Sequence, residues 1–231
     1  AVGVNNDFAA CKTGVAVRSA NNELSCGIDK QFVFITGKEF FYSCRKNFYH
    51  QGNENILDIW VPQLNFYKEG YDFYRERQKQ GDETWFYTCL APQGDFANRF
   101  LEQPLIKTRL IHWLNFKYGA TGYLHWGFNQ WFTGNDPYKE TTRMNEEGGN
   151  TLPGGDSWIV YPNNGKLYGS IRLEAMRDGI ADHTLLTMSG RKNPALAKEL
   201  CGDIIYDWTK YNTSSKDFKN IRHRILTALS K

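Results

Sequence analysis

The sequence predicts an α/β fold in which parallel strands alternate with helices, followed by a group of C-terminal helices. The main observation is a strand–helix–strand succession. Residues 84–90 and 122–127 are dense in β-branched and aromatic residues, and residues 104–118 between them have helical periodicity. Two strands that are joined through one helix lie parallel. A second observation is the length, because 231 residues are enough to bury a substantial core.

The helix of this unit has recognisable start and stop signals. Pro104 suits a first helical turn, and Gly119 suits the position after a helix end. Between them Ile106, Leu110 and Leu114 recur at four-residue spacing, which gives the helix one apolar face. The unit is therefore expected to pack as a complete βαβ element.

The loops after both strands are expected on the same side of the sheet. Ligands of parallel α/β folds bind at this carboxyl edge. Polar and aromatic groups collect there, as if to line a pocket for a ligand that is flat and rich in hydroxyls: Tyr87, Gln93, Trp126, Asn129, Gln130 and Trp131.

Three elements are expected before the central unit. Short buried strands are predicted at residues 32–36 and 56–62. The second ends at Pro62, which has no N–H to donate to a sheet. A helix is predicted at residues 65–80, and Gly81 follows it as a stop.

The part after the central unit begins with a long polar loop at residues 133–156. Loops of this length in compact domains are often functional or mobile. A strand at residues 157–162 is expected to close the sheet region. Helices are then expected to begin at Ser170, at Asn193 (running to about Tyr211) and at Ser215.

The helix that begins at Ser170 carries both apolar and charged residues. Its apolar members are Ile171, Leu173, Met176 and Ile180. Ion pairing along the helix face is the expected role of the charged set, although Arg172 could reach the rim of a barrel. This set consists of Arg172, Glu174, Arg177, Asp178 and Asp182.

The number of strands limits the architecture. Five or six strands, with helices after at least three of them, are fewer than the eight of a complete (β/α)8 barrel, which takes about 250 residues. The chain is therefore expected to be the later part of a TIM-like barrel or an open relative of one. The expected division is a partly irregular N-terminal segment, 1–55, a barrel-type region, 56–190, and a helical extension, 191–231.

Composition excludes several classes of partner. The net charge of +3 is small and no basic run is present, so a nucleic-acid partner is not expected. No stretch approaches the ~20 apolar residues of a membrane span. The five histidines lack paired ligand spacing, and we expect neither a metal site nor a cofactor.

The five cysteines have no metal-type spacing either. Cys11, Cys26 and Cys44 lie early in the chain and could hold an irregular region together by a disulfide. Cys89 lies in an apolar strand and is expected to be a buried free thiol. The sequence favours a secreted, periplasmic or lumenal protein.

Several motifs stand in the order of one known domain. They are Asp58-Ile59-Trp60-Val61-Pro62-Gln63, Trp85-Phe86-Tyr87-Thr88-Cys89, Asn98-Arg99-Phe100, Gly122-Tyr123-Leu124-His125-Trp126-Gly127, Gly155-Asp156-Ser157-Trp158-Ile159-Val160-Tyr161-Pro162, and Ser170-Ile171-Arg172-Leu173-Glu174 with Arg177-Asp178-Gly179. Over residues 56–190 the chain resembles the C-terminal catalytic region of glycoside hydrolase family 123, also known as the DUF4091 domain.

This resemblance implies a (β/α)8 barrel and a β-N-acetylgalactosaminidase acting on glycan chains. In that family the acetamido oxygen of the substrate attacks the anomeric carbon, an Asp orients it, and an adjacent Glu protonates the leaving oxygen. The family's Asp-Glu pair lies at the end of an earlier barrel strand. The one such pair here, Asp82-Glu83, precedes a predicted strand and is expected to be a solvated turn.

The remaining matches concern the part of the site that holds the sugar. By resemblance, the Tyr87 hydroxyl would bind the acetamido carbonyl as the catalytic contribution of this chain. The expected substrate-binding residues are Trp126 and Trp131 as apolar walls, Asn129 and Gln63 as partners of ring hydroxyls, and His125 beside them. Each has a structural alternative, because aromatic residues dominate cores and Trp85 shares a strand face with Tyr87.

Two functions of different class remain open. The first is a glycosidase acting on β-linked N-acetylhexosamine, with this chain as the sugar-binding side of a barrel and the rest of that barrel as its partner. The second is a non-catalytic carbohydrate-binding or structural relative that lacks the Asp-Glu pair. A glycan is the expected ligand in both.

Overall fold

The computed structural model describes most of the chain after residue 58. The described residues are 32–35, 59–131, 134, 136–141, 144–145 and 150–230. Cys11, Cys26 and Cys44, which could form a disulfide in the N-terminal segment, lie outside them. The chain divides into two compact units, Ala1–Tyr87 with Thr121–Leu124 and Thr88–Ala120 with His125–Lys231.

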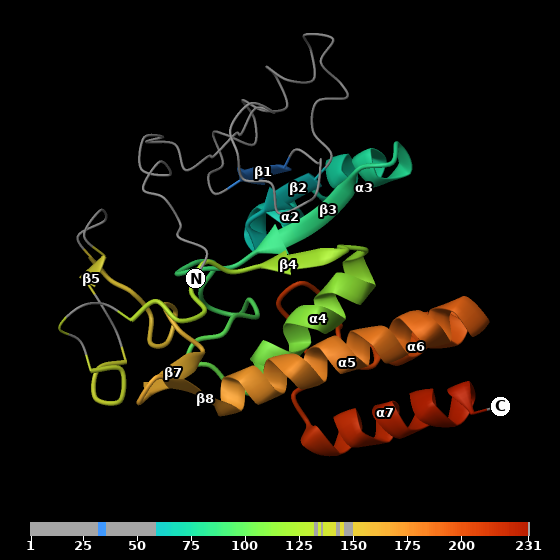
Figure 1. Ribbon diagram of the computed structural model, residues 1–231. Helices are drawn as coiled ribbons and strands as arrows, with labels where there is room; N and C mark the ends of the chain where they lie inside the picture. The colour runs from blue at the N-terminus through green and yellow to red at the C-terminus, as the bar shows by residue number, and fades with distance from the viewer. Residues whose placement is uncertain are drawn as a thin grey trace, which may run out of the picture. The chain divides into compact units, whose positions relative to one another are not determined.

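A four-stranded parallel sheet forms the first unit. Its strands are β1 (Phe32–Ile35), β2 (Ile59–Pro62), β3 (Glu83–Tyr87) and β4 (Gly122–Leu124), and they lie side by side in chain order (Figure 1). The parallel pairing of β3 with β4 confirms the α/β prediction. The described parallel strands form one open four-stranded sheet, so the barrel remains an expectation.

Two helices pack against this sheet where one was expected. Gly70 separates α2 (Leu64–Glu69) from α3 (Tyr71–Lys79). The core between helices and sheet is aromatic, because Tyr67 stacks on Phe86 with ring centroids 6.3 Å apart and meets Tyr74 edge to face at 5.4 Å. These three side chains are fully buried.

Asp82 is not the solvated residue that the sequence suggested. Its carboxylate accepts hydrogen bonds from the Trp60 indole at 2.7 Å and from Nε of the buried Arg77 at 2.5 Å. Asp82 thereby joins β2, α3 and the start of β3. The expectation was wrong because the buried arginine supplies a partner that the local sequence does not reveal.

Helices dominate the second unit: α4 (Ile106–Tyr118), α5 (Ile171–Lys192), α6 (Pro194–Gly202) and α7 (Ser215–Leu229). Helix α6 continues the course of α5, α7 runs beside them, and α4 packs across α5 (Figure 1). The left-handed Gly119 ends α4, and Ser170 caps α5 by accepting from Leu173 N, as expected. Helix α6 ends at Gly202 rather than near Tyr211.

The buried face of α5 carries polar side chains where apolar ones were expected. Ile171 is 71% exposed and Ile180 is 52% exposed, whereas Arg172 and Asp182 are buried. Asp182 accepts hydrogen bonds from Nε of Arg109 at 2.6 Å, from the Trp113 indole at 3.1 Å and from Arg222. One buried carboxylate therefore joins α4, α5 and α7, and the predicted apolar stripe was wrong at these positions.

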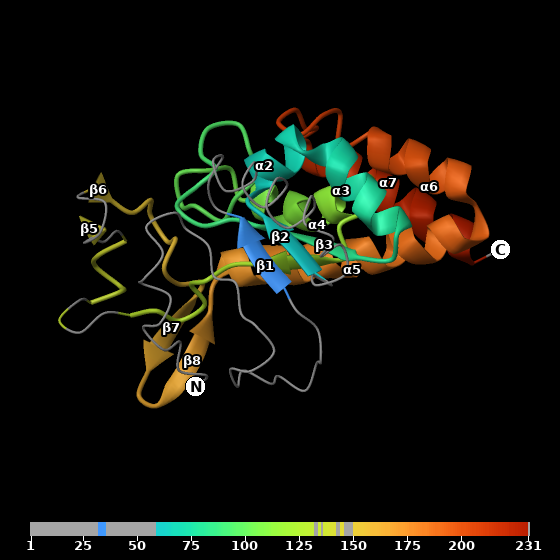
Figure 2. The ribbon, with the colours of Figure 1, turned by 90° about the horizontal axis from the view of Figure 1, so that it is seen from above.

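The predicted strand at 157–162 forms a separate hairpin. Strand β7 (Val160–Asn163) pairs antiparallel with β8 (Lys166–Gly169), and a smaller antiparallel pair consists of β5 (Met144–Asn145) and β6 (Asn150–Thr151) (Figure 2). Asn164 and Gly165 connect β7 to β8 with φ angles of 45° and 77°. An Asn-Gly turn with positive φ at both positions is a strong hairpin signal, which explains why this segment does not join the parallel sheet.

Candidate functional site

Gln63 and Tyr87 lie together at the carboxyl edge of the sheet in the first unit. Gln63 directly follows β2, Tyr87 ends β3, and a parallel bridge pairs them. Thr84 and Phe86 are fully buried, whereas Trp85 and Tyr87 on the alternate face are half-buried. The Tyr87 side chain therefore emerges on the less packed face of the sheet, while Gln63 is only 6% exposed.

In the second unit, residues 125–131 run antiparallel to residues 156–160. The main chain joins them through Gln130 N to Ser157 O at 3.1 Å and Ile159 N to Phe128 O at 2.9 Å. A bridge between Asn129 and Trp158 lies between these bonds. We call this paired segment the tryptophan strip.

Both tryptophans of the strip are fixed by their indole N–H groups. Trp126 Nε1 donates to Asp156 Oδ2 at 3.0 Å, and Trp131 Nε1 donates to the carbonyl of Val160 at 3.0 Å. Both side chains remain half-buried. An indole that is fixed through its nitrogen and partly exposed can present an apolar face to a ligand.

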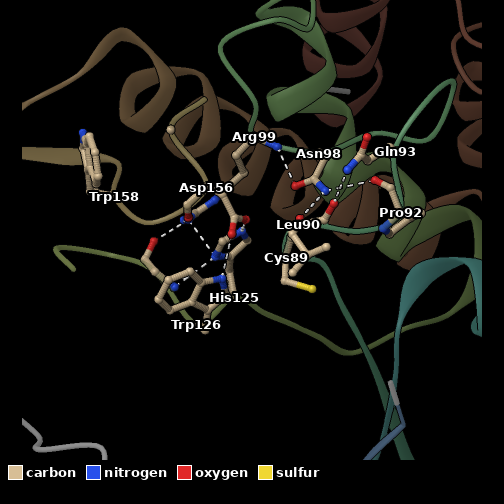
Figure 3. A network of polar contacts seen from close by, with 12 residues as sticks. Cys89, Leu90, Pro92, Gln93, Asn98, Arg99, His125, Trp126, Asp156 and Trp158 are labelled. Atoms are coloured by element: carbon tan, nitrogen blue, oxygen red, sulfur yellow. Dashed lines mark hydrogen bonds and ion pairs between the residues drawn. The ribbon is translucent and has the colours of Figure 1, made fainter. Parts of the chain in front are cut away.

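Buried Arg99 contacts the tryptophan strip at both of its segments (Figure 3). Its Nη2 lies 2.7 Å from His125 Nδ1 and 3.2 Å from the carbonyl of Asp156, and it also donates to the carbonyl of Gly127. Arg99 is itself placed by the loop after β3, in which buried Asn98 donates to the carbonyls of Cys89 and Pro92 and accepts from Arg99 N. As expected, Cys89 is a buried free thiol.

Arg172, which is 2% exposed, connects α5 to the same region. Its guanidinium donates to the carbonyls of Arg99, Gly155 and Trp158 at 2.7, 2.7 and 2.6 Å. Gly155 has a φ of +73°, and a Cβ there would collide with that guanidinium. Ion pairing on the helix face was therefore the wrong interpretation for Arg172, although the surface pair Arg177–Glu174 does form.

The hydrogen bonds around His125 assign its tautomer. Arg99 Nη2 and Gly127 N can only donate, and both lie within 3.1 Å of Nδ1. Nδ1 is therefore an acceptor, and the ring proton is on Nε2, which lies 3.3 Å from Asp156 Oδ1. Burial lowers the pKa of His125 well below its ordinary value, and the charges of Arg99 and Arg172 lower it further. The imidazole is neutral at physiological pH.

Asp156 is fully buried beside this neutral ring. Burial raises its pKa to about 6, against the lowering effects of the Trp126 hydrogen bond and of the charges on Arg99 and Arg172. The carboxylate is therefore ionised at neutral pH but accepts a proton in mildly acidic solution.

The comparisons with known proteins agree with the motifs that form this region. The family model described as "Glycoside hydrolase 123, catalytic domain" matches residues 36–189, about two thirds of the chain. The chain belongs to glycoside hydrolase family 123. The match begins at residue 36, earlier than the resemblance beginning at residue 56. A search of curated proteins gave no match.

A solved family 123 structure supports the fold. It is described as "The details of glycolipid glycan hydrolysis by the structural analysis of a family 123 glycoside hydrolase from Clostridium perfringens", and it aligns with a TM-score of 0.52 and 18% sequence identity. The alignment covers 80% of this chain and 33% of that chain. This chain therefore spans about a third of the length of that enzyme.

All the sugar-site residues expected from the sequence lie inside the family 123 match. Trp126 and Trp131 are half-buried and Asn129 is exposed, so each can meet a ligand. The His125 side chain is only 3% exposed and lies beside Asp156, which suits a positioning role. The sequence prediction did not select Arg99, Asp156 or Arg172 as site residues, although all three lie within the family 123 motifs and Asp156 follows two glycines.

Two absences concern the described residues alone. No three side chains of His, Cys, Asp or Glu gather there in a way that could hold a metal ion. In the same part of the chain, no helix is both long enough and apolar enough to cross a membrane.

Proposed function

We propose that the protein acts on glycans carrying β-linked N-acetylhexosamine, of the N-acetylgalactosamine type, and that this chain supplies residues that hold the sugar. The observation that carries the proposal is the tryptophan strip within the family 123 match. Its two indoles are fixed through their N–H groups and keep part of their surface exposed. Apolar walls beside polar groups are what a sugar ring and its acetamido methyl require.

The proposed reaction is substrate-assisted. The acetamido oxygen of the sugar attacks its own anomeric carbon, and the glycosidic bond to the leaving oxygen breaks while an acid protonates that oxygen. On the first unit, Tyr87 donates its hydroxyl proton to the acetamido oxygen in a hydrogen bond, which limits the orientations of the nucleophile, and Gln63 binds a hydroxyl. On the second unit, Trp126 and Trp131 contact apolar parts of the glycan and Asn129 binds a hydroxyl.

The two catalytic carboxylates of this mechanism are not supplied by Asp82-Glu83. Asp82 lies before β3, at its amino end, and its carboxylate is held by Trp60 and Arg77. In the catalytic proposal, the carboxylates belong to a part of the protein outside this chain. The same observation favours the second candidate, a non-catalytic glycan-binding relative without the pair.

One experiment separates the two candidates. The intact mass of the native polypeptide is measured together with hydrolysis of a chromogenic N-acetyl-β-galactosaminide. A mass well above 26.7 kDa with turnover supports the glycosidase. A mass of 26.7 kDa without turnover, but with quenching of tryptophan fluorescence by N-acetylgalactosamine, supports the binding protein. If the protein neither hydrolyses the glycoside nor binds N-acetylgalactosamine, both candidate functions are contradicted.

A further inference from the structure

The Asp156 carboxylate is the only charged side chain of the described residues that hydrogen-bonds the Trp126 indole. Its other oxygen, Oδ1, faces His125 Nε2 at 3.3 Å, a contact without full hydrogen-bond geometry. Figure 3 shows Asp156, His125 and Trp126 converging below Arg99. A change in the charge of this carboxyl therefore acts first on the indole.

When the His125–Asp156 pair takes up a proton, the proton binds to the Asp156 carboxylate. His125 Nδ1 already accepts from Arg99 and Gly127 N, and neither donor can reverse its role. Protonating Nδ1 would break both bonds and create a cation beside Arg99. The Asp156 carboxylate has no such obstacle.

The charges around Asp156 come from each segment packed against it. His125 follows β4, Arg99 lies in the loop after β3, and Arg172 lies on α5. Glu102 accepts from Gly154 N at 2.6 Å, near Arg172, and Tyr161 of β7 contacts the Arg172 guanidinium. The two arginines favour the ionised carboxylate, but their donors are used by backbone carbonyls and His125.

We propose that protonation of the Asp156 carboxyl in mildly acidic solution loosens the Trp126 indole and weakens glycan binding at the tryptophan strip. The proton comes from solvent and adds to a carboxylate oxygen, so the charge-assisted indole bond becomes a neutral one. Hydrogen bonds to ionised partners are about twice as strong as neutral ones. Asp156 is thus a positioning residue, and this inference rests on the proposed glycan-binding function.

The test follows the indole and the ligand separately, in the full-length protein. NMR records the Nε1–H resonance of Trp126, assigned by its loss in Trp126→Phe, between pH 4.5 and 7.5. Fluorescence titration with methyl N-acetyl-β-galactosaminide gives the dissociation constant at each pH. We expect the resonance to titrate with a midpoint near the Asp156 pKa of about 6, and the dissociation constant to rise roughly fivefold across the same midpoint.

Two variants make the result specific. In Asp156→Asn neither quantity should titrate, and binding should stay weak throughout. In Glu174→Gln, which removes an exposed carboxylate of α5, both should titrate as in the wild type. If Asp156→Asn does not fold, the wild-type titrations still decide the matter.

The outcomes distinguish this inference from the function on which it rests. A pH-independent Trp126 resonance overturns the coupling, and so does a resonance that titrates while the dissociation constant stays constant. A resonance that titrates in a protein that binds no N-acetylhexosaminide at any pH overturns the proposed function and, with it, the regulation of binding. That outcome leaves the link between Asp156 and the indole in place.

Discussion

At the scale of single residues, Tyr87 is the group whose removal tests the proposed chemistry most directly. We expect Tyr87→Phe to keep the fold, because the half-buried ring remains. In the proposed reaction this hydroxyl holds the nucleophilic acetamido oxygen, so its loss should lower kcat of the full-length protein by roughly 10²-fold, in line with the loss of other preorganised donors. Steady-state kinetics on the chromogenic glycoside check this.

Tyr206→Phe is the matched control for that measurement. Tyr206 is 58% exposed and lies outside the family 123 match, so kcat should not change. Equal loss of activity in the two variants would count against a specific role of the Tyr87 hydroxyl.

Arg172 is the residue on which the shape of the strip most depends. A lysine cannot reach three separate carbonyls, and each buried carbonyl left unpaired costs about 1–3 kcal/mol. We therefore expect Arg172→Lys to lower the free energy of unfolding by about 3 kcal/mol, measured by urea denaturation. Arg177→Lys, at an exposed pair on the same helix, should change it by less than about 0.5 kcal/mol.

At the scale of elements, the contact between α4 and α5 depends on one glycine. A Cβ at Gly179 would lie 2.5 Å from the carbonyl of Arg109 and 3.1 Å from the His112 ring. The two helices would have to separate, so Gly179→Ala should destabilise the protein by about 1–3 kcal/mol. Thermal unfolding measures the effect.

Gly190→Ala provides the control in the same helix. The nearest atoms to a Cβ there are 3.7 Å away, an ordinary contact. This variant should be neutral or slightly more stable, because alanine favours the helix over glycine by about 1 kcal/mol. If both variants lose the same stability, close packing at Gly179 is not the cause.

At the scale of the whole molecule, the dependence of stability on pH combines opposing groups. Burial lowers the pKa of His112 to about 4, and the nearby His183 adds to this effect. The contribution of His112 to stability is therefore present above pH 6.5, its ordinary pKa, and is lost as the pH falls through the folded-state pKa of about 4. The raised pKa of Asp156, about 6, acts in the opposite direction, because its contribution is present below 3.8 and is lost as the pH rises through 6.

The His112 contribution can be isolated by substitution. Between pH 6.5 and 4, titration of His112 should lower the free energy of unfolding of the wild type by up to about 3 kcal/mol, since one pKa unit corresponds to about 1.36 kcal/mol. We expect this decrease to be absent in His112→Gln. Urea denaturation at several pH values compares the slopes of wild type and variant. Equal slopes in the wild type and in His112→Gln would contradict the assignment.

The sequence by itself determined the parallel strands, the C-terminal end of α4, the cap of α5 and membership of family 123. These features depend on local signals: β-branched runs, a proline, a glycine, a serine and motifs in order. Two further features have local sequence signals. Gly70 would have predicted the division into α2 and α3, and Asn164–Gly165 would have predicted the separate hairpin.

Only the tertiary structure decided how the polar residues are used. Arg99, Arg172, Asp156 and Asp182 look like surface residues in the sequence, yet all four are buried. Their distant partners are backbone carbonyls, indoles and arginines 14 to 73 residues away, for example Arg172 with the carbonyl of Trp158 at a separation of 14 and with that of Arg99 at 73. A buried charge is tolerated only when such distant partners converge on it, and no periodicity along the chain records that convergence.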